Sequence, residues 1–205
     1  MWIKICGMTS PPAVAAAIEA GVDAIGFVFA ESSRQLTPRA AATLAKAARS
    51  RVCCVAVTCH PSQRTLDEIL NVFRPDVLQT DAADFATLRL PPGLERLPVV
   101  RAGEPVPAVL PQRLLFEGPV SGSGALTDFN AAHALARRSA LVLAGGLNAG
   151  NVAGAIAAVQ PFGVDVSSGV EERAGLKSTA AIVKFVAAAR AAAATPPRAA
   201  RKDIP

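Results

Sequence analysis

The chain has 205 residues, of which 51% are hydrophobic and only 4% aromatic, and it carries a formal net charge of +5. This length is expected to form one domain with a substantial core. No uninterrupted apolar stretch approaches the ~18 residues of a membrane span, and the N-terminus does not resemble a secretory signal. Few aromatic side chains are available to stack on bases, which argues against nucleic-acid binding. We therefore expect a cytoplasmic protein that binds neither membranes nor nucleic acid.

The elements are expected to alternate along the chain, with short apolar runs separated by longer, alanine-rich segments. The expected strands are Ile3–Cys6, Ala24–Phe29, Val52–Thr58, Val77–Gln79, Pro98–Arg101, Leu114–Glu117, Leu141–Ala144 and Gly163–Val166. The expected helices are Pro12–Ala20, Pro38–Ser50, Gln63–Phe73, Ala82–Leu88, Asn130–Arg137, Asn148–Val159 and Thr179–Ala193. Three prolines within residues 103–112 exclude a regular helix there, so the fifth helix is expected to be short or missing.

Eight strand–helix units predict a single (β/α)8 TIM barrel of parallel strands. A doubly wound open sheet is the structural alternative. Residues 1–190 are expected to form the barrel, and residues 191–205, rich in alanine, proline and arginine, a poorly ordered tail that supplies much of the excess positive charge.

The four cysteines, Cys6, Cys53, Cys54 and Cys59, fit no small disulfide scaffold. Their spacing also matches no zinc pattern, and the two histidines, His60 and His133, lie in dissimilar contexts. We therefore expect reduced thiols and no metal site.

In a (β/α)8 barrel the active site lies at the C-terminal ends of the strands. Polar or glycine residues occupy these ends here, and we predict that they line one site: Cys6, Arg34, Gln79, Asp81, Arg101, Glu117, Gly145, Gly146, Ser167, Ser168 and Gly169, with Asp165 inside the last strand.

The last two strands lead into "GGLNAGNV" and "SSGVEE", which are typical of phosphate-binding loops. Glycines let backbone N–H groups approach an anion, and phosphate commonly binds between the loops after strands 7 and 8 of this fold. A purely structural alternative is that these glycines only form tight turns.

Cys6 and Glu117 are the candidate base and acid. Nearby positive charge would favour the thiolate of Cys6, and partial desolvation would raise the pKa of Glu117 so that it holds a proton. Such a pair suits an isomerase that moves a proton. Considered alone, Cys6 fits a buried core residue better than a catalytic one. Arg34 is either a surface arginine or a bidentate partner for a substrate carboxylate.

The segments "KICGMT", "GFVFAESSRQLTP", "LQTD", "SGSGALTDF", "LAGGLNAGNV", "GVDVSSGVEE" and "GLKS" together resemble the phosphoribosylanthranilate isomerase family of tryptophan biosynthesis. The resemblance implies a cofactor-free Amadori rearrangement of a small phosphorylated substrate by a monomer or homodimer. It implies that Cys6 is the base, that Arg34 binds the anthranilate carboxylate, and that the last two loops hold the phosphate.

Three stretches depart from the family pattern. Glu117 stands where the family usually has aspartate, "LQTDA" replaces the usual "LQLHG", and "CCVAVTCHP" is an unusual third strand and loop. Alternative interpretations are a related isomerase of histidine biosynthesis, a dual-substrate form, or a non-catalytic barrel that binds a phosphorylated ligand.

Overall fold

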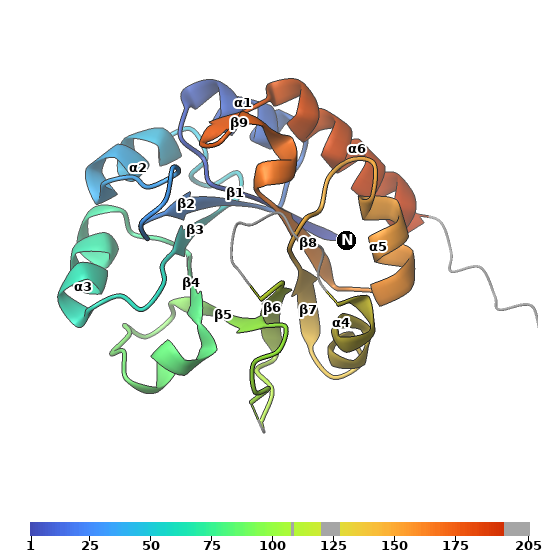
Figure 1. Ribbon diagram of the computed structural model, residues 1–205. Coiled ribbons are helices and arrows are strands. Elements are labelled where there is room, and N and C mark those ends of the chain that lie inside the picture. The colour runs from blue at the N-terminus through green and yellow to red at the C-terminus, as the bar shows by residue number, and fades with distance from the viewer. Residues whose placement is uncertain (108, 120–127, 195–205) are drawn as a thin grey trace, which may run out of the picture.

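Eight parallel strands close into a barrel in the computed structural model, which describes residues 1–107, 109–119 and 128–194 (Figure 1). Each strand pairs with the next in chain order, and β8 closes the barrel on β1. The strands are β1 (Trp2–Cys6), β2 (Ala24–Val28), β3 (Cys53–Val57), β4 (Val77–Asp81), β5 (Glu95–Arg101), β6 (Arg113–Glu117), β7 (Ala140–Leu143) and β8 (Gly163–Val166). The predicted barrel is confirmed, and the open sheet is excluded.

Helices surround the barrel, and several begin where the sequence predicts because side-chain caps fix their first turns. Thr37 and Ser62 accept backbone N–H bonds at the starts of two of them, and Asp128 does so at a third. The helices are α1 (Pro11–Glu19), α2 (Pro38–Ala45), α3 (Gln63–Val72), α4 (Phe129–Ala136), α5 (Val152–Val159) and α6 (Thr179–Ala194). Among the described residues, no helix is long and apolar enough to cross a membrane.

Three predicted helices differ clearly from the structure. Helix α2 ends at Ala45 rather than Ser50. Helix α5 begins at Val152 rather than Asn148, because Asn148 and Asn151 bond to the backbone of a preceding turn. The segment predicted as Ala82–Leu88 is a 3-10 helix, η1 (Ala82–Ala86).

The predicted gap in the ring of helices is present: the described residues between β5 and β6 form no helix. A groove of about 870 Å³, lined in part by Phe85, Leu94 and Pro107, lies on this side of the barrel.

The alternation of side chains along each strand divides the core in two. The larger cluster packs between the strands and the helices and includes Ile5, Phe27 and Leu143. A smaller cluster that includes Val55, Leu97 and Val142 fills the barrel interior. The side chains of Lys4, Cys6 and Asp165 also point into the barrel interior. Cys6 lies at the mouth of the barrel, and Lys4 and Asp165 lie one layer beneath it.

A small hairpin follows β8 and was not predicted from the sequence. After the 3-10 turn η2 (Ser168–Val170), β9 (Glu171–Arg173) pairs antiparallel with β10 (Leu176–Lys177). Thr9 donates a hydrogen bond to the Gly175 carbonyl in the turn, at 2.7 Å. The hairpin therefore packs over the loops of β1 and β2 and brings its own charged side chains to the mouth.

Residues 120–127 and 195–205 lie outside the described residues. Most of the "SGSGALTDF" motif and most of the predicted tail fall there.

Candidate active site

The predicted base, Cys6, is the last residue of β1 and lies at the mouth with 7% of its surface exposed. Directly below it, the fully buried Lys4 donates a hydrogen bond to Asp165 across the β1–β8 pair, at 2.9 Å. Asp165, which the sequence predicts to bind substrate, lies one layer below Cys6 and is the partner of Lys4.

Gly26 on β2 makes room for this arrangement. A methyl carbon added there would lie 3.1 Å from the Cys6 Sγ and 3.2 Å from the Lys4 Nζ. These contacts are tighter than ordinary van der Waals packing, so only glycine leaves both groups in place. A thiol and an ammonium group are therefore held side by side in the barrel interior.

This cation distinguishes Cys6 from an ordinary buried cysteine. Burial raises the pKa of the Cys6 thiol, while Lys4 and Lys177 lower it. For comparison, burial raises the pKa of Cys54 to about 11, and the positive charge of Arg49 only partly opposes it. The two lysines thus favour the Cys6 thiolate, as expected from nearby positive charge, but desolvation outweighs them and the pKa of Cys6 is raised overall.

Arg34, Glu171 and Lys177 form a second charged group beside Cys6. Arg34 bonds Glu171 in bidentate fashion, with its Nε and Nη2 at 2.7 and 2.8 Å from the two carboxylate oxygens. The Lys177 Nζ lies 2.6 Å from the same carboxylate and 3.2 Å from the Ser167 hydroxyl. Burial raises the pKa of Glu171, but the bonds from Arg34 and Lys177 outweigh it and lower the pKa overall.

The predicted acid, Glu117, ends β6, and two strands, β7 and β8, separate it from β1. The Arg101 Nε lies 3.2 Å from one Glu117 oxygen. The same guanidinium also pairs with Asp81 at the end of β4, so Arg101 bridges two carboxylates at the mouth. Arg101, at the end of β5, therefore links the residues that end β4 and β6.

Gln79 also lies in the barrel interior on β4, with 6% of its surface exposed. Its side-chain oxygen is buried, and among the described residues it has no hydrogen-bond partner. A buried acceptor without a partner is costly, which is consistent with the prediction that Gln79 meets a donor on a ligand.

The two glycine-containing loops that the sequence predicts to hold phosphate lie against each other. Gly145 and Gly146 both have positive φ, 94° and 63°. A methyl carbon on Gly169 would lie only 1.9 Å from the Leu147 carbonyl oxygen. Ser167 donates to the Cys6 carbonyl at 3.2 Å, which ties the β8 loop to the β1 loop.

Three site residues were not singled out from the sequence: Lys4, Glu171 and Lys177. The role of Lys4 could have been suspected from the sequence, because charged residues are rare in buried strands. Lys4 interrupts the first predicted strand and Asp165 the last. Glu171 and Lys177 lie within quoted motifs, but only the unpredicted hairpin brings them to the mouth.

A closed parallel barrel with a thiol, carboxylates and paired cations at its C-terminal mouth defines a (β/α)8 barrel enzyme. The family described as N-(5'phosphoribosyl)anthranilate (PRA) isomerase matches residues 3–188. The chain belongs to this family.

Relatives of known name agree with this assignment. N-(5'-phosphoribosyl)anthranilate isomerase of Brucella canis is 38% identical, over 95% of this chain and 96% of the relative. The crystal structure of TrpF from Jonesia denitrificans is 36% identical, with a TM-score of 0.79, over 97% of this chain and all of that one. A phosphoribosyl anthranilate isomerase crystallised with reduced 1-(o-carboxyphenylamino)-1-deoxyribulose 5-phosphate is 25% identical, with a TM-score of 0.77, over 93% of this chain and 99% of that one.

Proposed function

We propose that this chain isomerises N-(5-phosphoribosyl)anthranilate to 1-(2-carboxyphenylamino)-1-deoxyribulose 5-phosphate in tryptophan biosynthesis, with Cys6 as general base and Glu117 as general acid. Family membership supports the reaction. The observation that most supports the assignment of the base is the buried Lys4 ammonium beneath the Cys6 thiol.

In the proposed mechanism, Glu117 protonates the furanose ring oxygen, and the sugar opens to a Schiff base. Cys6 then removes the proton from C2, and the resulting enolamine tautomerises to the ketone. Lys4 stabilises the negative charge on the sulfur before proton removal. Arg101 bonds the Glu117 carboxylate that forms when the acid has given up its proton.

The other mouth residues are proposed to hold the substrate. Glu171 bonds the edge of the Arg34 guanidinium formed by Nε and one N–H of Nη2. The anthranilate carboxylate would therefore approach the other edge, formed by Nη1 and the second N–H of Nη2. The phosphate would bind between Gly145–Gly146 and Ser167–Gly169, where two loops meet at adjoining strands.

We also propose that the substrate is a small phosphorylated molecule, that the protein is cytoplasmic, and that it is a monomer or a homodimer.

Steady-state conversion of the anthranilate ribotide by purified protein tests the activity, and assay of the histidine-pathway ribotide tests the alternative substrate. Cys6→Ser should lower kcat far more than it changes substrate binding, whereas Cys54→Ala, on the outer face of a different strand, should retain turnover. Full activity of Cys6→Ser would exclude Cys6 as the base.

Glu117→Gln keeps the size of the side chain and removes its proton. We expect a fall in kcat of about 10²-fold or more, as for the loss of a general acid. Unchanged turnover would exclude Glu117 as the acid. Ligand-dependent stabilisation without any turnover of the parent protein would instead support a binding protein.

A further inference from the structure

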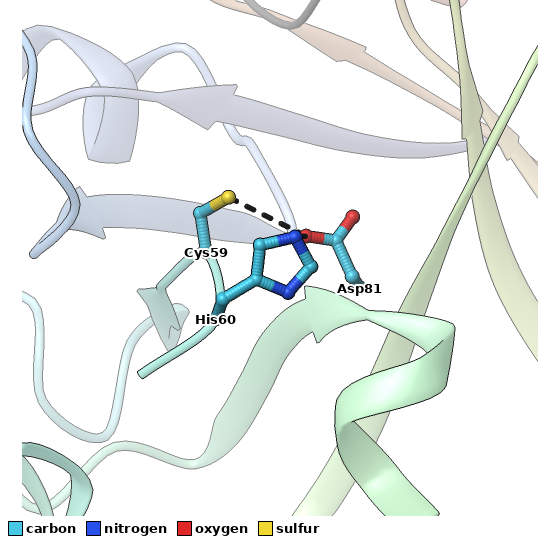
Figure 2. A group of neighbouring side chains, drawn as sticks. All are labelled: Cys59, His60 and Asp81. Carbon is cyan, nitrogen blue, oxygen red and sulfur yellow. Dashed lines mark hydrogen bonds and ion pairs between the residues drawn. The ribbon is translucent and has the colours of Figure 1, made fainter. Parts of the chain in front are cut away.

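Three side chains with metal-binding atoms converge on one edge of the mouth. Cys59 and His60 follow β3, and Asp81 ends the neighbouring strand β4 (Figure 2). The Asp81 Oδ2 lies 3.4 Å from the Cys59 Sγ and 3.3 Å from the His60 Nε2. All three ligand atoms lie within 4.8 Å of one another.

A fourth residue fixes the direction of the imidazole. Asp84 accepts a bond at 2.8 Å from the His60 Nδ1, and its other oxygen accepts from the His60 backbone N–H at 3.1 Å. The Thr80 hydroxyl donates a hydrogen bond to that second oxygen, at 2.5 Å. His60 therefore turns its Nε2 toward Asp81, in the carboxylate–histidine arrangement that orients metal ligands.

The backbone of His60 supports the same orientation. His60 has a φ of 46°, in the left-handed region that a residue with a side chain seldom adopts. The contacts with Asp84 offset the cost of this conformation. Asp81 is also fixed, because its side chain is 7% exposed and its Oδ1 pairs with Arg101. Two of the three donors are thus held in position without a metal.

We propose that Cys59, His60 and Asp81 bind a divalent transition metal of the zinc type, with a fourth coordination position open to solvent. A thiolate, an imidazole and a carboxylate form a donor set that zinc accepts, and three protein ligands with one open position are common at zinc sites. Cys59 loses its proton to solvent when it binds the metal.

The site goes beyond the isomerisation and does not depend on it. The spacing of cysteines and histidines in the sequence gave no sign of the site, because its ligands come from the loop after β3 and from the end of β4. Cys59 and His60 are adjacent, and Asp81 follows 22 residues after Cys59. Only the parallel register of β3 and β4 brings them together.

Cobalt(II) is a suitable probe, because a cobalt–thiolate bond absorbs in the near ultraviolet and tetrahedral cobalt absorbs in the visible. Titration of the reduced protein should give both bands with saturation at one equivalent, and zinc should remove them. Cys59→Ser should abolish the near-ultraviolet band, and His60→Ala should weaken binding at least tenfold. Cys54→Ala and His133→Ala are matched controls that should bind as the parent does.

Thermal unfolding gives a second measurement. A metal that binds only the folded state at 100 times its Kd should raise the Tm of a chain of this size by roughly 5 to 10 °C. This shift should disappear in Cys59→Ser and remain in Cys54→Ala. A parent protein without a thiolate band would refute the proposal. So would bands of equal strength in Cys59→Ser, which would assign them to another thiol.

Discussion

Replacing Lys4 with methionine removes the ammonium group beneath Cys6 and keeps most of the apolar stem. The two groups are close, because the Cys6 Sγ and the Lys4 Nζ each lie within 3.2 Å of the same point above Gly26 and so cannot be more than twice that distance apart. The substitution should therefore act on the thiol and leave the surrounding strands in place.

The magnitude follows from Coulomb's law. At about 6 Å and an effective dielectric constant of about 20, two unit charges interact by roughly 3 kcal/mol. This corresponds to about two pKa units. Asp165 acts on Cys6 in the opposite direction and offsets part of the effect. We therefore expect the pKa of the base to rise by about one unit, and kcat/KM at pH 7 to fall about tenfold.

The assay is the pH dependence of kcat/KM for the parent and for Lys4→Met. The variant should lose activity at neutral pH, because a smaller fraction of Cys6 is then present as the thiolate. It should regain activity as the pH rises and that fraction increases. Lys4→Met also leaves Asp165 buried without its partner, which costs stability. The double variant Lys4→Met/Asp165→Asn removes both charges and should fold better, with a smaller pKa shift. A folded variant with an unchanged pH profile would refute the role of Lys4.

Three other predictions concern the mouth. Gly26→Ala should reduce kcat about tenfold with little loss of fold, because its methyl group would displace the Cys6 Sγ; an unchanged kcat would show that the thiol tolerates displacement. Gly169→Ala should raise KM more than it lowers kcat, because it forces the β8 loop away from the Leu147 carbonyl; an unchanged KM would place the phosphate elsewhere. Glu171→Gln should destabilise the protein at neutral pH, as measured by urea unfolding. Since the folded-state pKa of Glu171 is lowered, the stability it contributes is present above its unfolded pKa of about 4.3 and is lost as the pH falls through the folded value. The difference between parent and variant should therefore shrink in acid, and a constant difference would contradict this origin.

The barrel and most strand ends could be predicted because buried parallel strands appear in the sequence as short apolar runs. Cys6, Arg101 and Glu117 were placed at the mouth for the same reason, since each ends such a run. The partner of Arg34 could not be predicted, because Glu171 reaches it only through the hairpin of residues 171–177, whose two strands of three and two residues are too short to show a periodic pattern. The depth of Asp165 also depends on the register between β1 and β8, which residue types alone do not specify.

The start of α5 shows a related limit. Asn148 has the residue type of a helix cap, yet its side chain bonds the Gly150 N–H in a turn before the helix begins. Asparagine serves both purposes equally well, so sequence could not choose between them.

The described residues between β5 and β6 form no helix, and this has a consequence for local unfolding of the barrel. Helices α1 and α6 cover the side of the barrel that carries β1, whereas the side that carries β5 and β6 borders the groove beside Phe85 and Leu94, which lies toward the N-terminal ends of these two strands. Regions with fewer buried apolar contacts open locally at lower free energy. Backbone amides of β5 and β6 should therefore exchange with solvent deuterium faster than those of β1. Near the unfolding temperature, the acid would lose its position before the base does.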